Sequence, residues 1–159
     1  MRHFLYSFIY LTFFSFIYSN NLEFTNASIM AGESGTIDLL LDNPEYQIEG
    51  IQFKIIPSTI FNVEEVHGGR SEDAGFQIHK NAKGTILGFS MTGTSIPEGS
   101  GTLIEISFSE YSGDGICFGT DPAFNVISNL YGNELEANWG DCYFIIANGD
   151  VLSLIHIWR

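Results

Sequence analysis

The segment Gly35-Thr-Ile-Asp-Leu-Leu-Leu-Asp42 decides the fold class, because its apolar side chains recur at every second position. Successive side chains of an extended chain point to opposite faces, so Ile37, Leu39 and Leu41 share one face. Asp38 lies on the opposite face, which is therefore suited to solvent. This pattern predicts a strand with one apolar face, and such a face has to be buried against another layer of structure.

The same alternation recurs on both sides of this segment, and no stretch between residues 22 and 146 shows sustained helical periodicity. Residues 85–91, for example, place Leu87, Phe89 and Met91 on one side of an expected strand. Turns rich in Gly, Pro, Asn and Asp separate the alternating stretches. The other expected strands are residues 51–55, 76–79, 104–108, 124–127 and 142–146, the last apolar enough to be covered on both sides.

Eight or so short strands, each with one apolar face, cannot bury those faces within a single sheet. Two sheets packed face to face solve this problem, with a core roughly 10 Å thick between them. The sequence therefore predicts an all-β fold of two sheets, a β-sandwich or a jelly roll.

Composition fits a folded sheet protein and excludes two classes of partner. Hydrophobic residues make up 45% of the chain and charged residues only 16%, which excludes an intrinsically disordered protein. Asp and Glu number 19 against 6 Lys and Arg, so the formal net charge is -13. This charge repels phosphate backbones and anionic lipid headgroups, so we expect neither nucleic-acid binding nor charge-driven membrane binding.

Both ends of the sequence differ from the body between them. Residues 1–19 carry a positive charge at Arg2 followed by an apolar, aromatic run, which predicts a secretory signal peptide cleaved after Ser19 or Asn20. The run is shorter than the ~20 residues that span a bilayer, so we expect no membrane insertion after cleavage. Residues 152–159 contain Leu-Ser-Leu-Ile-His-Ile, which resembles the translated end of a transposase adapter used for sequencing libraries. We therefore predict a domain over residues 21–147 and recruit nothing from residues 152–159 into a site.

Two cysteines, Cys117 and Cys142, lie in the late part of the body. In an oxidising compartment they have one possible pairing, and the expected strands that hold them could be neighbours. The alternative is two buried free thiols that pack as small hydrophobic side chains. A metal site at these residues is not expected, because two cysteines without a clustered histidine pair lack the ligands.

The sequence shows no arrangement expected of an enzyme or a cofactor site. Glu64 and Glu65 are adjacent on an expected strand, so they would point to opposite faces and could not act on one substrate. Glu72-Asp73 sits in a polar loop, where a solvated charge pair is the ordinary explanation. His67 and His79 flank this loop and could approach each other, but two histidines alone do not predict a metal site. We expect no catalytic residues, no cofactor and no metal.

Aromatic side chains offer a different kind of site. Flat aromatic rings can stack on the face of a pyranose, so an exposed strip of them would suit a glycan. Core or edge packing is the alternative for each ring taken alone. The candidate rings for glycan contact are Tyr111, Tyr131, Trp139 and Tyr143.

Four stretches of the body, in this order and at this spacing, resemble the cohesin domain. They are Ala31-Gly-Glu-Ser-Gly-Thr-Ile-Asp-Leu-Leu-Leu, Ile48-Glu-Gly-Ile-Gln-Phe-Lys-Ile, residues 57–66, and Gly101-Thr-Leu-Ile-Glu-Ile-Ser-Phe. The resemblance covers residues 22–146 and implies a jelly-roll sandwich of about nine strands with a non-catalytic binding function. Cohesins often bind a dockerin module on another protein, and related modules bind polysaccharide. The late region with Cys117, Trp139 and Cys142 departs from the family pattern, so no interface residues are carried over.

The residues after the body resemble the start of a dockerin. Asn148-Gly-Asp-Val151 is similar to the opening of the dockerin calcium loop, with Asp150 at the position of the first calcium ligand. The remaining ligands of that loop are missing, so we expect no calcium here. The resemblance implies that the intact gene encoded a signal peptide, a cohesin-like domain and a dockerin.

These observations lead to three hypotheses about function. The first is a secreted, non-catalytic docking module that binds a dockerin-type partner in an extracellular polysaccharide-handling assembly. The second is a carbohydrate-binding module that contacts polysaccharide through exposed aromatics, and the third is a structural cell-surface domain. Docking predicts a flat sheet face of mixed polar and apolar side chains, whereas glycan binding predicts an exposed aromatic strip. The structural role predicts neither.

Overall fold

The computed structural model describes residues 19–30, 34–56, 62–81, 83–111 and 115–144. Residues 1–18 of the predicted signal peptide, the dockerin-like residues 148–151 and the adapter-like residues 152–159 lie outside these ranges, so the expectations for them stay predictions. Within the described ranges, no helix is both long enough and apolar enough to cross a membrane.

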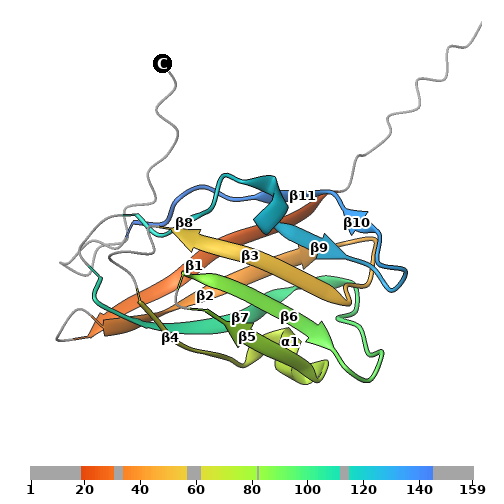
Figure 1. The fold of residues 1–159 in the computed structure, drawn as a ribbon, viewed down its shortest axis with the longest axis horizontal. Coiled ribbons are helices and arrows are strands. Elements are labelled where there is room, and N and C mark those ends of the chain that lie inside the picture. The colour runs from red at the N-terminus through yellow and green to blue at the C-terminus, as the bar shows by residue number, and fades with distance from the viewer. Residues whose placement is uncertain (1–18, 31–33, 57–61, 82, 112–114, 145–159) are drawn as a thin grey trace, which may run out of the picture.

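The chain folds into two sheets that pack face to face (Figure 1). The first sheet has the strand order β11-β1-β2-β7-β4. Its neighbouring strands are antiparallel except for β1 and β11, which run parallel. The strands of this sheet are β1 (Asn20–Met30), β2 (Ser34–Asn43), β4 (Asn62–His67), β7 (Gly99–Ser109) and β11 (Ala137–Trp139).

The second sheet has the strand order β10-β9-β3-β6-β5, with all neighbours antiparallel. A short strand, β8, pairs with the end of β3 beyond this path. Two short helices lie in the connections, α1 (Gly69–Asp73) and the 3-10 helix η1 (Pro122–Phe124). The strands of this sheet are β3 (Gly50–Ile56), β5 (Phe76–Lys80), β6 (Thr85–Ser90), β8 (Cys117–Phe118), β9 (Val126–Ser128) and β10 (Glu134–Leu135).

The core lies between the sheets and consists of the inward residues that the alternation predicted. In β2, the side chains of Ile37, Leu39 and Leu41 are completely buried. Ile106 of β7 lies beside Ile37 in the same sheet, Phe53 belongs to β3 of the other sheet, and both are completely buried as well. Each such side chain contributes about 1.5–3 kcal/mol on burial, so this layer is the main source of stability.

The predicted fold class is confirmed, because the chain is an all-β, two-sheet sandwich with almost no helix. The part of the chain that the structure describes has 11 strands, where the resemblance implied about nine. The difference lies in the late region, where β8, β9, β10 and β11 are only two or three residues long. Segments this short are connections that pair briefly with a longer strand as they pass it.

Strand β6 turns its longer side chains away from the core. Leu87 and Phe89 share one side, as their spacing predicted, but that side faces outward and Leu87 is 40% exposed. The inward positions are Ile86, which is completely buried, and Gly88. A Cβ on Gly88 would lie 2.6 Å from Cδ1 of Ile78, so glycine lets the neighbouring strand pack closely over β6. A period of two shows which residues share a face, but it does not show which face is buried.

The expected strand over residues 124–127 begins later than predicted. Phe124 is the last residue of η1, and the strand β9 starts at Val126. Asp121 caps η1, since its carboxylate accepts a hydrogen bond from the N–H of Ala123 at 3.0 Å, and Pro122 follows at the first helical position. The local capping signal therefore outweighs the apolar run that suggested a strand here.

The expectation that residues 142–146 form a strand covered on both sides is wrong for the part that the structure describes. Tyr143 makes only an isolated antiparallel bridge with Ile116. Cys142 and Phe144 are exposed, the latter by 48%. This segment runs past the end of the sandwich rather than through its interior, so its apolar character does not make it a core strand.

Candidate functional site

The outer face of the second sheet carries two rows of side chains that cross four strands. In one row, Gln77 of β5 lies opposite Phe89 of β6, followed by Gly50 of β3 and Ser128 of β9. In the next row, His79 lies opposite Leu87, followed by Gln52 and Val126. We call this surface the mixed face, defined by Gly50, Gln52, Gln77, His79, Leu87, Phe89, Val126 and Ser128.

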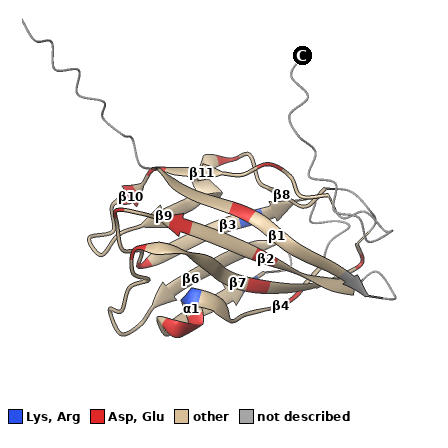
Figure 2. Cartoon of the chain, turned by 180° about the vertical axis from the view of Figure 1, so that it is seen from behind, with Lys and Arg blue, Asp and Glu red and all other residues tan. Residues whose placement is uncertain are grey.

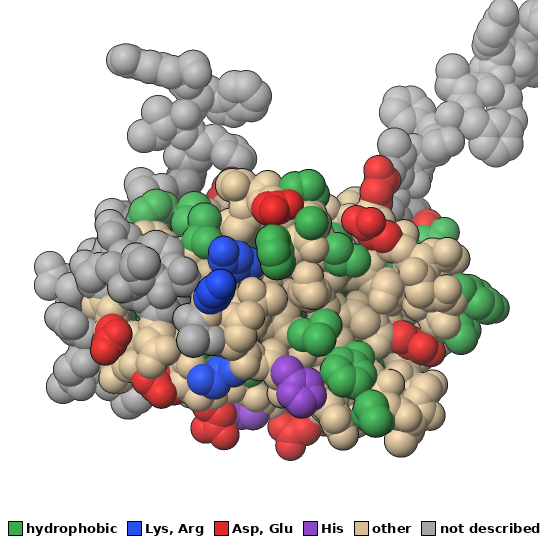
Figure 3. All heavy atoms as spheres, in the orientation of Figure 1, with side chains coloured by type: hydrophobic (Ala, Val, Ile, Leu, Met, Phe, Trp, Pro, Cys, Tyr) green, Lys and Arg blue, Asp and Glu red, His purple; other side chains and the backbone are tan. Residues whose placement is uncertain are grey.

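The centre of the mixed face is apolar, and polar side chains surround it. The ring of His79 stacks on that of Phe89, with centroids 5.7 Å apart and an interplanar angle of 19°. Gly50 lies opposite Phe89 and contributes no side chain, and the hydroxyl of Ser128 lies over it, 2.6 Å from where a Cβ would be. Figure 3 shows hydrophobic side chains gathered next to a histidine on this face. An apolar centre within a polar surround is the usual anatomy of a protein–protein interface.

The short helix η1 extends the mixed face at one edge. The side-chain amide of Gln52 donates a hydrogen bond to the backbone oxygen of Ala123 at 3.2 Å. The ammonium group of Lys54 lies 5.7 Å from the ring centroid of Phe124, in cation–π geometry. Because Phe124 is itself 40% exposed, it adds an aromatic surface to this edge.

The outer face of the first sheet is acidic (Figure 2). Among the side chains whose exposure the structure describes, which leaves out the last two of β1, none of the exposed large apolar ones belongs to β1, β2, β4 or β7. The outward leucine of this face, Leu40, is half-buried, so carboxylates dominate what the face presents to solvent. Its outward carboxylates are Glu23, Asp38, Asp42, Glu65 and Glu105.

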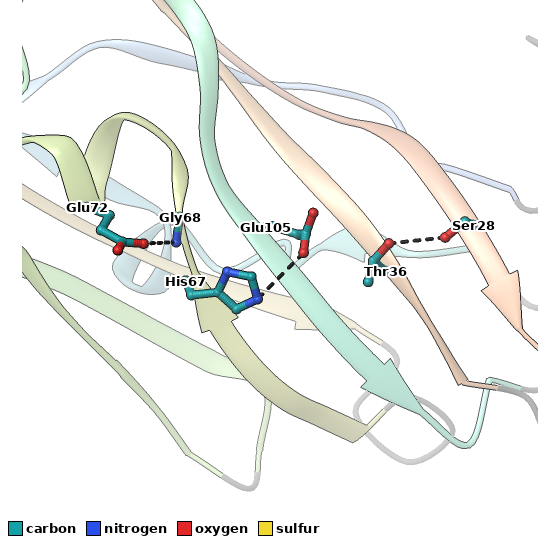
Figure 4. A network of polar contacts seen from close by, with 6 residues as sticks. All are labelled: Ser28, Thr36, His67, Gly68, Glu72 and Glu105. Carbon is teal, nitrogen blue, oxygen red and sulfur yellow. Dashed lines mark hydrogen bonds and ion pairs between the residues drawn. The ribbon is translucent and has the colours of Figure 1, made fainter.

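Polar contacts on and beside this acidic face are local (Figure 4). Nε2 of His67 lies 3.5 Å from a carboxylate oxygen of Glu105 on the neighbouring strand, and both side chains are more than 40% exposed. The hydroxyls of Ser28 and Thr36 lie 3.1 Å apart across β1 and β2. Exposed pairs of this kind contribute at most about 1 kcal/mol, so they join neighbouring strands without forming a site.

Solved structures with the same arrangement of strands are cohesin domains. The solution structure of CaCohA2 from Clostridium acetobutylicum matches 82% of this chain and 92% of its own length, with a TM-score of 0.59 and 15% sequence identity. A cohesin from Clostridium thermocellum, solved in the Coh-OlpA–Doc918 complex, matches 76% and 93%, with a TM-score of 0.56 and 19% identity. The chain has the cohesin fold. No protein-family model matches the sequence, and comparison with curated protein sequences gives no match.

The cohesin fold also extends to proteins outside the clostridia. A non-cellulosomal cohesin from the archaeon Archaeoglobus fulgidus matches 76% of this chain and 85% of its own length, with a TM-score of 0.54 at 13% identity. At such identities the comparison shows the fold alone. The function therefore has to be argued from this chain's own surface.

The predicted glycan-contact residues occupy three different environments on the cohesin fold. The prediction for Tyr111 is wrong, because its ring is only 5% exposed and packs edge-on against Phe108, with centroids 5.9 Å apart. Tyr131 is 79% exposed in the turn between β9 and β10. Trp139 is half-buried and packs against Phe118, with ring centroids 5.2 Å apart. Because Tyr111 is buried, these three rings do not all belong to one exposed strip of the kind that glycan binding predicts.

The histidines singled out in the sequence do not approach each other. His67 is on β4 and pairs with Glu105 on the outer face of the first sheet, whereas His79 is on β5 and stacks on Phe89 on the opposite side of the molecule. Within the described ranges, no group of three or more His, Cys, Asp or Glu side chains is placed to hold a metal ion.

The two glutamates of β4 are arranged differently from the prediction. A register shift between Val63 and Glu65 makes a bulge, so Glu64 and Glu65 are both exposed instead of pointing to opposite faces. Glu64 accepts hydrogen bonds from the side chains of Asn62 and Ser109. Two neighbouring side chains thus hold the carboxylate of Glu64 at the edge of the sheet, which is a structural role.

Cys117 and Cys142 are joined by a disulfide, and their Cα atoms are 4.2 Å apart. Cys117 begins β8, and Cys142 follows β11, so the bond fastens the end of the described chain to the second sheet. Two backbone hydrogen bonds between Ile116 and Tyr143, of 2.7 and 2.8 Å, lie directly beside it. Together they close the loop that contains η1, β9, β10 and β11.

Proposed function

We propose that this chain is an exported, non-catalytic docking module that binds a dockerin-type module of another protein through the mixed face. The observation that carries the proposal is the contrast between the two outer faces. One is acidic, with its outward Leu40 half-buried, and the other places the exposed Leu87 beside Phe89 and Val126 on a face whose defining residues include no Asp or Glu. Desolvating an apolar centre stabilises a complex, whereas desolvating an acidic face costs free energy.

The choice of a dockerin as partner is supported by the complexes in which similar folds were solved. The cohesin from Clostridium thermocellum and the CaCohA2 domain were both crystallised as complexes with dockerins. A cohesin from Acetivibrio cellulolyticus was likewise solved with the dockerin of Cel5. By analogy of fold, we propose that this chain acts in an extracellular assembly that handles polysaccharide.

Replacing Leu87 with glutamine is expected to weaken binding of a dockerin partner at least tenfold, about 1.4 kcal/mol, because it removes the apolar centre of the mixed face. The measurement is calorimetric titration of the chain with recombinant dockerin modules from the host's secreted proteins. Leu40→Gln is the matched control, since Leu40 is an outward leucine on β2 in the other sheet. The melting temperature of both variants is measured in parallel.

Unchanged binding by Leu87→Gln, or equal loss in Leu40→Gln, would contradict docking through the mixed face. Failure of the unmodified chain to bind any dockerin would contradict the proposal that its partner is a dockerin. A parallel panel of insoluble polysaccharides tests the alternative, which gains support if retention occurs and is lost on Trp139→Ala. Sensitivity to a chelator is expected to come from the partner, because the described part of this chain has no metal-binding cluster.

Export is the second part of the proposal, and it rests on the signal-like residues 1–19 together with a disulfide in the fold. We expect the mature chain to begin at Asn20. The side chain of Asn20 is only 6% exposed, and its amide donates a hydrogen bond to the backbone oxygen of Glu136 at 2.7 Å. N-terminal sequencing of the secreted protein measures this, and a chain that begins at Asn21 would contradict the expectation.

A further inference from the structure

A hollow of about 560 Å³ opens at the edge where the chain crosses from one sheet to the other. One wall is the segment from β8 through η1, and the other is the segment from β10 to β11, which Figure 1 shows side by side at the top of the molecule. The residues that matter for its chemistry are Thr120, Pro122, Asn125, Glu134, Glu136 and Trp139. The hollow borders the mixed face at η1 but shares none of the residues that define that face.

An aromatic surface borders the hollow. Trp139 is half-buried, with its ring packed against Phe118 and Phe53 at centroid distances of 5.2 and 6.5 Å. These contacts fix the orientation of the indole, and the part of Trp139 that they leave uncovered lines the hollow. Pro122 adds an apolar surface on the facing wall. A ligand in the hollow therefore meets a rigid aromatic ring.

Most polar groups of the η1 wall are already engaged. The side-chain oxygen of Asn125 accepts a hydrogen bond from the N–H of Lys54 at 3.2 Å, and its amide donates to the backbone oxygen of Gly119. The N–H of Gly119 donates to the backbone oxygen of Lys54 at 2.7 Å. Pro122 has no N–H at all. This wall offers a ligand little beyond the hydroxyl of Thr120.

The other wall supplies acceptors that carry charge. Glu134 and Glu136 are both exposed at the hollow, and neither makes an ion pair within the described ranges. Among the described residues that line the hollow there is no Lys or Arg, the stem of Lys54 packs beside Gly119 with its ammonium group over Phe124, and the whole chain has a net charge of -13. The hollow is therefore rich in anionic acceptors and poor in donors, so its electrostatic potential favours a cation.

This imbalance separates two kinds of ligand. A saccharide hydroxyl needs a donor as well as an acceptor to satisfy both of its functions, and the side chains that line the hollow supply few free donors beside the two carboxylates. A guanidinium group has five N–H donors and no acceptor, forms paired hydrogen bonds with carboxylates, and stacks on indole rings. We propose that this hollow binds the arginine side chain of a partner polypeptide, stacked on Trp139 and paired with Glu134 and Glu136.

The test uses the full chain with Trp158→Phe, which leaves Trp139 as the sole tryptophan. Its fluorescence is followed in low salt during titration with a blocked Gly-Arg-Gly peptide. The matched ligand is the same peptide with citrulline, which has the shape of arginine but no charge. We expect a saturable change with the arginine peptide and at least tenfold weaker binding of the citrulline peptide.

The matched protein variants separate the site from the overall charge. Glu134→Gln/Glu136→Gln is expected to weaken arginine binding at least tenfold. Glu45→Gln/Glu98→Gln removes the same charge from exposed residues elsewhere and is expected to leave binding within twofold. The proposal is overturned by equal binding of the citrulline peptide, by equal weakening in both double variants, by a response to cellobiose alone, or by no saturable change.

Discussion

Replacing Arg70 with alanine is expected to lower the free energy of unfolding by about 3 kcal/mol, although Arg70 is outside the core. Arg70 belongs to α1, a helix of five residues, and its guanidinium donates four hydrogen bonds. Two of these bonds go to the backbone oxygens of Leu41 and Gly99, at 3.1 and 3.0 Å. The side chain thereby joins β2 to the start of β7.

The other two bonds explain why the loss is large. The guanidinium donates to the backbone oxygen of Pro97 and, at 2.8 Å, to the side-chain oxygen of Asn43, which is completely buried. An acceptor left without its donor in the interior costs about 1–3 kcal/mol. Burial lowers the pKa of Arg70, and the negative charge of Asp42 partly offsets this, so the guanidinium stays protonated at neutral pH.

The measurement is chemical denaturation of the variant and of the unmodified chain under the same conditions. Arg70→Lys is expected to recover little of the loss, because one ammonium group cannot reach four acceptors arranged around a planar guanidinium. Lys83→Ala is the control, since Lys83 is exposed in the turn before β6, and the change should stay within about 0.5 kcal/mol. An unchanged midpoint for Arg70→Ala would show that the four hydrogen bonds have no net effect.

The sequence did not predict this arrangement, because nothing local in it shows that α1 packs on β7. The contact depends on Gly69, which has a positive φ of 62°. A Cβ there would lie 2.5 Å from the backbone oxygen of Thr102 and 2.6 Å from that of Leu103. The glycine reads as an ordinary turn residue in the sequence, and its role appears only when β7, more than thirty residues later, is placed beside it.

The central strands could be predicted well, because burial on one face leaves a period of two in the sequence. Ile37 and Leu39 of β2 and Phe108 of β7 are buried as their alternation predicted. The late region could not be predicted in the same way. There the short strands pair with partners far away in the sequence, as Asn20 does with Ala137, and such pairing leaves no local pattern.

The mixed face was missed for a related reason. Its apolar centre consists of Leu87 and Phe89, and an apolar residue at every second position is first read as a core strand. The sequence signal that distinguishes the outward face lies at the two alternating positions, one before Leu87 and one between Leu87 and Phe89. Ile86 and Gly88 form a second alternating set that can pack more tightly, and glycine in the middle of a strand often marks close packing.

Removing the disulfide is expected to lower the free energy of unfolding by about 3.5 kcal/mol, the loop-closure estimate for a bridge that spans 25 residues. The variant is Cys117→Ser/Cys142→Ser, measured by denaturation with and without a reductant. Reductant should destabilise the unmodified chain by a similar amount and leave the double variant unchanged. Equal effects of reductant on both proteins would show that the loss has another cause than the bond.

Without the disulfide, unfolding should begin locally in the loop that the bond closes, because the strands in this loop make the fewest pairings with the rest of the fold. Strands β9, β10 and β11 have only two or three residues each, so little else fastens them to the long strands. In the Trp158→Phe background, the fluorescence of Trp139 reports its packing against Phe118, and Phe118 directly follows Cys117. Without the disulfide, we expect this signal to change at lower denaturant than the signal of the sheets. Coincident transitions would instead mean that the loop and the sandwich unfold as one cooperative unit.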